Sequence, residues 1–288
     1  MSRSRLADLA AGPLVLLGLI LSPLPISWVQ ALGRVLGAIW YHVLPIRRRV
    51  VARNLALALP DVPLARRRAI ARGTFAHVAT VVLELLWSSR RTPVQLGRLV
   101  EVHGLDRYRV VREQGRGVVA ATAHLGNWDL LGCSQAGAGV PLTIVTKTLS
   151  SPRIDRLWNR SRLASGLRLA AASGSIAQVI RSLRRGEVVG LVVDQRCPAS
   201  EGGVRLPFFG HAAWTTIAPA VLAARTGAAI LPVMTFRRRD GTHVVLVGEE
   251  IERRATAPAT MAHVNSILER WIRNHPDQWL WLHRRWRQ

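Results

Sequence analysis

The sequence predicts an α/β protein with a mainly parallel central sheet, helices on both of its faces, and N-terminal membrane-associating helices before it. From residue 100 onward, short apolar segments alternate with amphipathic ones, which is typical of a parallel sheet covered on both sides. The first 45 residues are mostly apolar instead. With 49% hydrophobic residues in 288, the chain can bury a large core. We therefore expect membrane-associating helices in 1–45 and an α/β domain in 46–288.

The first apolar segment, Leu6 to Ile26, is marginal for a membrane-spanning helix. Such a helix needs about 20 apolar residues, and Pro13, Pro23 and Pro25 interrupt this one. No small-residue cleavage site follows it, which argues against a removed signal peptide. We predict an uncleaved anchor that either spans the membrane or lies in its interface. A buried N-terminal helix is the alternative.

Two further helices are predicted before the sheet. The first, Trp28 to Leu44, is apolar and aromatic and is followed by Arg47–Arg49 and Arg53. Aromatic residues beside an arginine cluster are typical of a membrane interface. The second runs from Pro63 to Ser88, and we expect Glu84 in its apolar half to be a buried structural acid.

The remaining elements alternate as a parallel sheet requires. Strands are predicted near 117–123, 142–146, 188–193, 229–235 and 243–247, and helices near 104–113, 127–138, 151–165, 175–185, 214–226 and 260–274. Sheets of this kind bind ligands beyond the carboxyl ends of their strands. Functional side chains are therefore sought where each strand ends.

The segment His124–Asp129 lies where a buried strand turns into a helix. The new helix offers free backbone N–H groups and the positive end of its dipole. Asp129 falls in the first helical turn, so we expect it to turn back toward His124, hold the imidazole tautomer and stabilise the imidazolium. The spacing alone also occurs by chance. The alternative is a core histidine followed by an ordinary first-turn acid.

Other polar residues are predicted at the same edge of the sheet. Lys147 ends one strand, and Asp194 and Gln195 end another. Four arginines lie along the helix after Lys147, namely Arg153, Arg156, Arg160 and Arg162. The first three share one face, which either binds phosphate or carboxylate groups or is simply solvated. Phe208 and Phe209 follow in a hairpin-like segment and either line an acyl pocket or belong to the core.

Charge and missing motifs narrow the function. A net charge of +23 favours an anionic partner, such as nucleic acid, an anionic membrane or an acidic carrier protein. Two cysteines, Cys133 and Cys197, form no disulfide framework. The sequence has no His pair at metal-ligand spacing, Walker motif, GxGxxG after a strand or GxSxG elbow, so we predict no metal, nucleotide or other cofactor.

Five segments together resemble a known family. They are Arg53–Pro60, His124–Asp129, Asp194–Gln195, Pro207–Gly210 and Trp279–Trp286. They are similar, in order, to the "R-N-L-x-x-x-F-P", "H-F-G-N-W-E", "D-Q", "F-F-G" and C-terminal motifs of the bacterial lipid A late acyltransferases, the lauroyl and myristoyl transferases of the lysophospholipid acyltransferase superfamily. Asp129 replaces the glutamate usual in this branch, and the wider superfamily uses aspartate there.

The resemblance implies an O-acyltransferase that moves a fatty acyl chain from an acyl carrier protein thioester to a hydroxyl of an anionic glycolipid, a lipid A precursor. His124 would be the general base and Asp129 its partner. The backbone N–H groups of Gly126–Trp128, with Asn127 between them, would hold the oxyanion. The basic face would suit the carrier protein and the acceptor phosphates. The implied location is the cytoplasmic face of the bacterial inner membrane.

Two other functions stay open. Related enzymes acylate other membrane lipids, so a phosphatidylinositol-mannoside-like acceptor or a lysophospholipid is an alternative. A basic membrane-binding or nucleic-acid-binding protein without catalysis is the other. The sequence carries no helix-turn-helix, zinc-finger or RNA-binding signature, and we therefore expect no nucleic acid partner.

Overall fold

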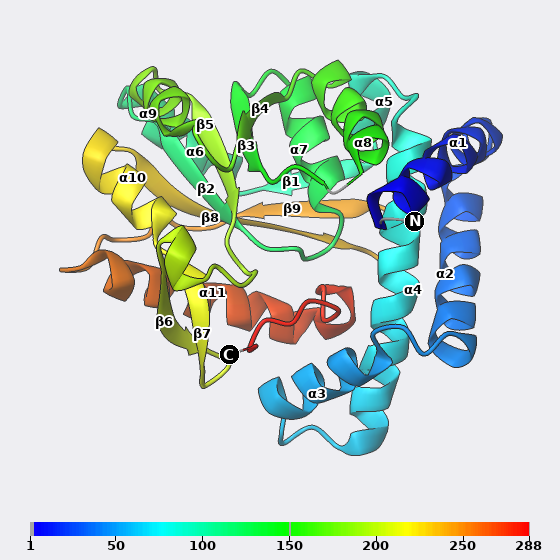
Figure 1. Ribbon diagram of the computed structural model, residues 1–288. Coiled ribbons are helices and arrows are strands. Elements are labelled where there is room, and N and C mark those ends of the chain that lie inside the picture. Colours follow the sequence, from blue (N-terminus) through cyan, green and yellow to red (C-terminus); the bar gives the residue numbers. More distant parts are fainter. Residues whose placement is uncertain (1–2, 150, 288) are drawn as a thin grey trace.

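The computed structural model describes residues 3–149 and 151–287 and has a central sheet between two layers of helices (Figure 1). In this part of the chain the sheet order is β1 (Val100–His103), β9 (His243–Val247), β8 (Ala229–Arg237), β2 (Val118–Thr122), β5 (Val188–Val192), β3 (Leu142–Thr146) and β4 (Arg168–Ala171). Neighbouring strands are parallel except β8 and β9. The predicted fold class is confirmed.

The central strands are the apolar runs that the sequence marks most clearly. In β2, Val119 and Ala121 face one buried cluster, whereas Val118 faces the other, because successive side chains of a strand point to opposite faces. Both faces of the sheet are therefore buried. The strands β1 and β4 were not predicted. Each has only four residues and is partly exposed, so neither has a long apolar run.

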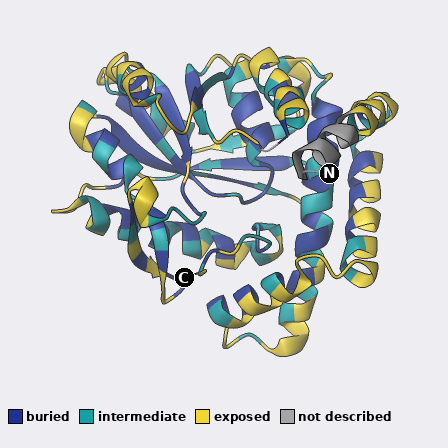
Figure 2. Ribbon diagram, in the orientation of Figure 1, coloured by how far each residue is buried: buried dark blue, intermediate teal, exposed yellow. Residues whose placement is uncertain are grey.

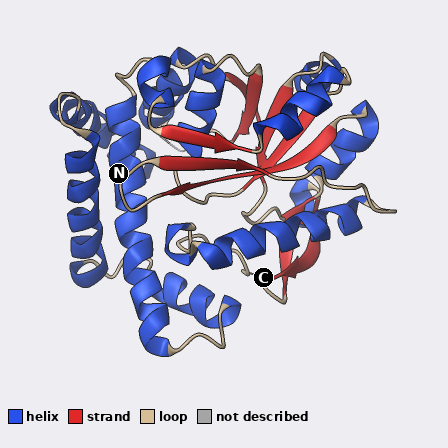
Figure 3. Ribbon diagram, turned by 180° about the vertical axis from the view of Figure 1, so that it is seen from behind, coloured by secondary structure: helices blue, strands red, loops and turns tan. Residues whose placement is uncertain are grey.

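Helices cover both faces. On the face of Val118 lie α5 (Pro93–Gly97), α6 (Leu105–Glu113), α7 (Trp128–Gly137) and α8 (Pro152–Ala164). On the face of Val119 lie α9 (Ile176–Arg184), α10 (Ala218–Thr226) and α11 (Ala257–Asn274). Figure 3 shows α11 extending from the side of the small hairpin toward α4. Short 3-10 turns occur at Ala199–Glu201 and Pro276–Gln278.

The helix predicted from residue 214 begins later, at Ala218, because the hairpin is longer than expected. Strand β6 (Gly203–Phe208) pairs antiparallel with β7 (His211–Thr216). The two residues between them, Phe209 and Gly210, have φ values of 51° and 74°. Two consecutive residues with positive φ make the turn type that matches the twist of paired strands, and this turn carries β7 through the residues assigned to the helix.

Four helices precede the sheet: α1 (Arg3–Leu21), α2 (Ile26–Val43), α3 (Arg48–Ala58) and α4 (Leu64–Ser88). Residues 1 and 2 of the predicted N-terminal segment lie outside the described residues. Helix α2 packs closely on α4, since a Cβ atom added at Gly33 or Gly37 would lie 2.5 Å from Thr80 or 2.3 Å from Ala76. Two glycines four residues apart thus allow the two helices to approach closely.

Among the described residues, α4 is the one helix long and apolar enough to cross a membrane. Most of that apolar window is buried inside the protein, and α4 contributes to both core clusters. The outer side of α2 is exposed instead (Figure 2). Its exposed large apolar residues are Trp28, Leu32, Val35, Leu36, Ile39 and Val43, which recur at helical spacing on one face.

Candidate active site

His124 lies just beyond the carboxyl end of β2, the strand between β8 and β5. Its backbone N–H donates to Oδ2 of Asp194 at 2.9 Å, and its Nδ1 lies 2.8 Å from Oδ1 of the same carboxylate. The imidazole is 17% exposed, whereas the Asp194 side chain is buried. A buried carboxylate therefore holds both the backbone and the ring of His124 in place.

Asp194 is itself held by Trp279, whose indole N–H donates to Oδ2 at 2.7 Å. Burial alone would raise the pKa of Asp194, but the charge and hydrogen bonds of His124 lower it below its usual value. The carboxylate therefore stays ionised, and it favours the tautomer in which Nδ1 carries the proton. Nε2 is then unprotonated and accepts a hydrogen bond from the side-chain amide N–H of Gln195 at 3.3 Å.

The turn after His124 needs glycine at position 126. Gly126 has a φ of 60°, and a Cβ atom there would lie 2.3 Å from the carbonyl oxygen of Thr235. Asn127 then caps α7, since its side chain accepts a hydrogen bond from the N–H of Leu130 at 2.9 Å. This is an ordinary N-cap interaction. The predicted sequence of strand, tight turn and helix is present.

Asp129 has different partners from those expected. Its carboxylate accepts hydrogen bonds from Nε of Arg162 at 2.7 Å and from the indole N–H of Trp158 at 3.1 Å. Both partners lie on α8, so Asp129 joins the start of α7 to α8. The carboxylate bonded to the imidazole is Asp194 and not Asp129. The sequence suggested that Asp129 turns back to orient His124. In the structure Asp129 bonds to α8 instead, and Asp194 bonds to His124.

A buried polar network supports the same turn from behind. Asn127 donates to Glu84 at 2.8 Å, and Arg237 forms an ion pair with Glu84 at 2.5 Å. His77 bridges Arg237 and the carbonyl oxygen of Gly126, each at 3.1 Å. Burial would raise the pKa of Glu84, but Arg237 and His243 lower it below its usual value. Glu84 is thus the buried structural acid that the sequence predicted, and it is ionised.

A cavity of about 1120 Å³ opens beside His124. It extends between the sheet and the helices α6, α7 and α8, and its walls are mainly apolar. The lining includes Ala120, Leu142, Val188, Leu231 and Leu167. Gly190 lines it without a side chain, where a Cβ atom would approach Ile144 to 3.3 Å. Cavities of this size hold small-molecule ligands, and the walls of this one suit an apolar group.

The four arginines predicted on α8 lie on two different sides of the helix. Arg162 is partly buried against Asp129 and lines the cavity together with Trp158. Arg153, Arg156 and Arg160 are exposed and do not line it. Lys147 lines the cavity near its surface and pairs with Glu201 at 2.5 Å.

Of the remaining predicted site residues, one lines the cavity and two lie in the core. Gln195 lines the cavity. Phe208 and Phe209 are buried in the core against Trp279 and Trp286 and contribute nothing to the cavity wall. Of the two alternatives predicted for these residues, acyl pocket or core, the structure supports the core, because the hairpin turns both rings inward.

Some backbone groups of the turn already form hydrogen bonds within the protein. The N–H of Gly126 donates to the carbonyl oxygen of Gln278 at 3.1 Å, and the N–H of Leu280 donates to the carbonyl oxygen of His124 at 3.1 Å. The C-terminal segment therefore lies along the motif like an added strand. This removes Gly126 from the predicted oxyanion donors and leaves the first turn of α7.

Trp279 and Trp158 are site residues that sequence reasoning did not single out. Trp279 belongs to a tryptophan-rich C-terminal segment whose position depends on distant contacts. Asn54 holds that segment by donating to the carbonyl oxygens of Trp281 and His283 at 2.8 and 2.7 Å. Arg285 is buried and donates to the carbonyl oxygen of Gln195 at 3.0 Å. Thus the segments around Asn54, His124, Asp194, Phe208 and Trp279 meet in one place.

Comparison with known proteins shows the family of this chain. A family model described as bacterial lipid A biosynthesis acyltransferase matches residues 11–288. The chain is 29% identical over 272 residues to a lipid A biosynthesis lauroyltransferase of Escherichia coli K12, covering 92% of this chain and 87% of that protein. It is 26% identical over 274 residues to a lipid A biosynthesis palmitoleoyltransferase of the same organism, covering 90% and 87%.

A relative with a different named activity also matches. Over 193 residues the chain is 28% identical to a phosphatidylinositol mannoside acyltransferase of Mycolicibacterium smegmatis, covering 66% of this chain and 63% of that protein. These named activities share the transfer of an acyl group to a glycolipid. Because the family model spans nearly the whole chain, the chain belongs to the bacterial lipid A biosynthesis acyltransferase family.

Proposed function

We propose that this acyltransferase moves a fatty acyl chain from an acyl carrier protein thioester to a hydroxyl of a lipid A precursor. The observation that carries the proposal is the position of His124, bonded to a buried carboxylate at the mouth of a large apolar cavity. One group can accept a proton there, and the cavity beside it can take a hydrocarbon chain. Both are needed for acyl transfer.

His124 acts as the general base. With Nδ1–H donated to Asp194, Nε2 accepts the proton of the acceptor hydroxyl while the hydroxyl oxygen attacks the thioester carbonyl carbon. The tetrahedral intermediate then collapses, the carbon–sulfur bond breaks, and the imidazolium returns its proton to the leaving thiolate. No acyl-enzyme forms. Base catalysis of this kind contributes about 10²–10⁴-fold. In this mechanism Asp194 takes the orienting role that the sequence suggested for Asp129.

The first turn of α7 supplies the oxyanion donors. Its N–H groups lie at the positive end of the helix dipole, and the ring of Trp128, the first residue of α7, contacts His124 with 4.7 Å between the centroids. Asp129 in this turn forms an ion pair with Arg162 of α8, so the pair positions the donors without touching the reacting atoms.

Two features favour an acidic carrier protein and a membrane-embedded acceptor. The net charge of +23 attracts acidic partners. The exposed apolar face of α2 carries Trp28 near one end and is followed by Arg47–Arg49, which suits the boundary between acyl chains and headgroups. We assign α2 to the cytoplasmic face of the inner membrane, lying in the interface.

The membrane assignment is tested by vesicle flotation. The double variant Val35→Asp/Ile39→Asp replaces two exposed side chains of α2 and should lose most binding to anionic vesicles. Arg181→Gln/Arg184→Gln on α9 serves as the control. Equal flotation of wild type and the α2 variant would contradict the assignment.

The transfer itself is tested with purified protein, lauroyl-acyl carrier protein and a detergent-dispersed lipid A precursor. Wild type should yield the acylated lipid, whereas His124→Ala should abolish transfer at an unchanged melting temperature. Filling the cavity with Ala120→Leu should shift the preferred acyl chain toward shorter lengths, measured by mass spectrometry in a mixture of donors. Activity of His124→Ala within tenfold of wild type would remove it as the base.

The phosphatidylinositol mannoside acyltransferases among the relatives make a related acceptor the second candidate. The same assay decides between them when a phosphatidylinositol mannoside is offered beside the lipid A precursor. Faster acylation of the mannoside would replace the lipid A assignment and leave the mechanism at His124 intact.

A further inference from the structure

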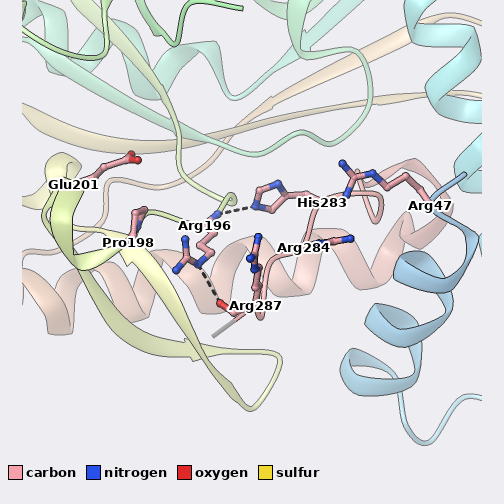
Figure 4. Close-up of a pocket in the computed structure, with 7 residues that line it drawn as sticks. All are labelled: Arg47, Arg196, Pro198, Glu201, His283, Arg284 and Arg287. Atoms are coloured by element: carbon pink, nitrogen blue, oxygen red, sulfur yellow. Dashed lines mark hydrogen bonds between the residues drawn. The ribbon is translucent and has the colours of Figure 1, made fainter. Parts of the chain in front are cut away.

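A second cavity, of about 570 Å³, lies next to the apolar one (Figure 4). Arg196 and Glu201 line both cavities, and Arg196 follows Gln195, whose amide reaches His124. The second cavity is therefore separated from the catalytic centre by one residue of the chain.

The walls of this cavity are strongly basic. Three parts of the chain contribute arginines: Arg47 from the turn between α2 and α3, Arg196 after β5, and Arg284 and Arg287 from the C-terminal segment. The single acidic residue of the lining, Glu201, is paired with Lys147 at 2.5 Å. The cavity thus gathers four guanidinium groups whose charge is not neutralised within it.

None of these four arginines has an acidic partner among the described residues. Arg196 is held by neutral groups, since its Nε donates to the carbonyl oxygen of Arg287 at 3.1 Å and its backbone N–H donates to Nε2 of His283 at 3.0 Å. Burial lowers the pKa of His283 to about 4, so this ring accepts that bond as a neutral imidazole.

Arg47 stands in an unfavourable backbone conformation. Its φ is 68°, in the left-handed region that is unfavourable for a residue with a side chain. Glycine would form the same turn without that cost. Figure 4 shows His283 between the side chains of Arg47 and Arg196. A long cationic side chain at this position therefore makes the turn less stable than glycine would.

We propose that this basic cavity, lined by Arg47, Arg196, Arg284 and Arg287, binds a phosphate group of the glycolipid acceptor. The inference rests on the proposed function. Planar guanidinium groups bind phosphate oxygens bidentately. The cavity is reached from the end of α2, where Arg47 follows the exposed apolar residues Leu44 and Ile46. An acceptor whose acyl chains lie along α2 would present its headgroup phosphate here and its hydroxyl to His124.

The variant Arg47→Gly/Arg284→Gln tests the assignment. The glycine removes a guanidinium and relieves the positive φ, so the melting temperature should not fall through residue 47. The KM for the phosphorylated acceptor should rise at least about tenfold, the effect of losing one charge-assisted contact. The KM for the acyl donor should not change. Arg181→Gln/Arg184→Gln removes the same charge from exposed positions of α9 outside the cavity and should behave as wild type.

The acceptor offers a second comparison. Enzymatic removal of its phosphates should raise the acceptor KM of wild type. It should change the acceptor KM of the variant little, because the variant no longer binds the phosphate. A phosphate in the carrier arm of the donor could also occupy a basic cavity. A rise in the donor KM without a change in the acceptor KM would overturn the proposal. Equal KM values in the variant and its control would overturn it as well.

A binding measurement separates this proposal from the proposed function. Inorganic pyrophosphate is titrated into the full chain in detergent by calorimetry, which needs no acyl transfer. Wild type and the control should bind it, and Arg47→Gly/Arg284→Gln should bind at least about tenfold more weakly. If the protein fails to acylate lipid A precursors yet shows this difference, the cavity stands and the substrate assignment fails. If no difference is seen, the cavity assignment fails whatever the acyl transfer assay shows.

Discussion

At the scale of single residues, the partner of His124 comes from the neighbouring strand. Asp194 follows β5, which is paired with β2 along its whole length, so residues just past the two strands meet at one edge. Asp129 is nearer in sequence, but the helix that begins at Trp128 directs it toward α8. The acid closest in the chain is therefore engaged elsewhere, and the acid across the sheet completes the site.

Asp194→Asn should lower kcat about 10²–10⁴-fold with little change in either KM. An asparagine amide placed against Nδ1 would donate to it, so the proton would move to Nε2 and the base would be lost. Asp194→Glu should recover part of the activity. Initial rates across a pH range for the three proteins would check this, and full kcat in Asp194→Asn would contradict the role.

Asp129→Asn should act mainly on stability. Arg162, whose side chain is 12% exposed, would be left without its counter-charge, at a cost of about 3–5 kcal/mol. The double variant Asp129→Asn/Arg162→Gln should recover part of the lost stability. Denaturant unfolding of all three proteins is the measurement. Loss of transfer by Asp129→Asn at unchanged stability would instead indicate direct contact with the reaction.

At the scale of elements, α8 presents different residues on its two sides. Asp155, Asn159 and Arg162 face the cavity, and they recur at i, i+4 and i+7 on one side of a helix. Arg153, Arg156 and Arg160 occupy the exposed side. The regular arginine spacing in the sequence is real, but it marks the side of the helix away from the cavity.

Arg156→Ala and Arg160→Ala should therefore leave the acceptor KM unchanged and alter stability by no more than about 0.5 kcal/mol. Arg162→Ala, on the same helix, should reduce both stability and turnover because it leaves the buried Asp129 without its counter-charge. Kinetics and unfolding of the three variants compare the two sides of α8 directly. A raised acceptor KM in either exposed variant would restore the phosphate-binding interpretation of this face.

The C-terminal segment shows how an element without regular structure completes the site. Its backbone bonds to Gly126 and His124 place Trp279 against Asp194. Arg285 and Asn54 then tie the same segment to β7 and α3. A change at Asn54 would thus reach the active site through the tryptophan that orients Asp194.

At the scale of the whole molecule, buried histidines make the fold sensitive to acid. Burial and the charge of Arg237 lower the pKa of His77 to about 3, and burial lowers the pKa of His283 to about 4. The unfolded chain binds protons at these residues below about pH 6.5, whereas the folded protein does not until the pH is much lower. Stability is therefore complete above pH 6.5 and falls as the pH decreases toward 4.

The free energy of unfolding should fall between pH 6.5 and 4, and each histidine should contribute up to about 1.4 kcal/mol per pH unit. His77→Gln keeps a hydrogen-bond donor for Gly126 but removes the titrating group, so its stability should depend less steeply on pH. Urea unfolding at several pH values measures both slopes. Parallel curves for wild type and variant would show that His77 does not titrate as described.

The sequence by itself determined the central strands, the helices between them and the turn at His124. These follow from local patterns: long apolar runs, helical spacing and a glycine where the backbone needs positive φ. It also placed Asp194 and Gln195 at the correct edge, because parallel strands end together. The short strands β1 and β4 have no such runs and form only because neighbouring strands are there to pair with them.

Only the tertiary structure decided which side chains meet. The pairing of His124 with Asp194, the turning of Asp129 toward Arg162, and the arrival of Trp279 depend on contacts between segments up to 85 residues apart. The basic cavity brings together Arg47 and Arg284 from opposite ends of the chain. Local sequence sets the direction of each element, but side-chain partners are selected by how those elements pack, and packing is a property of the whole chain.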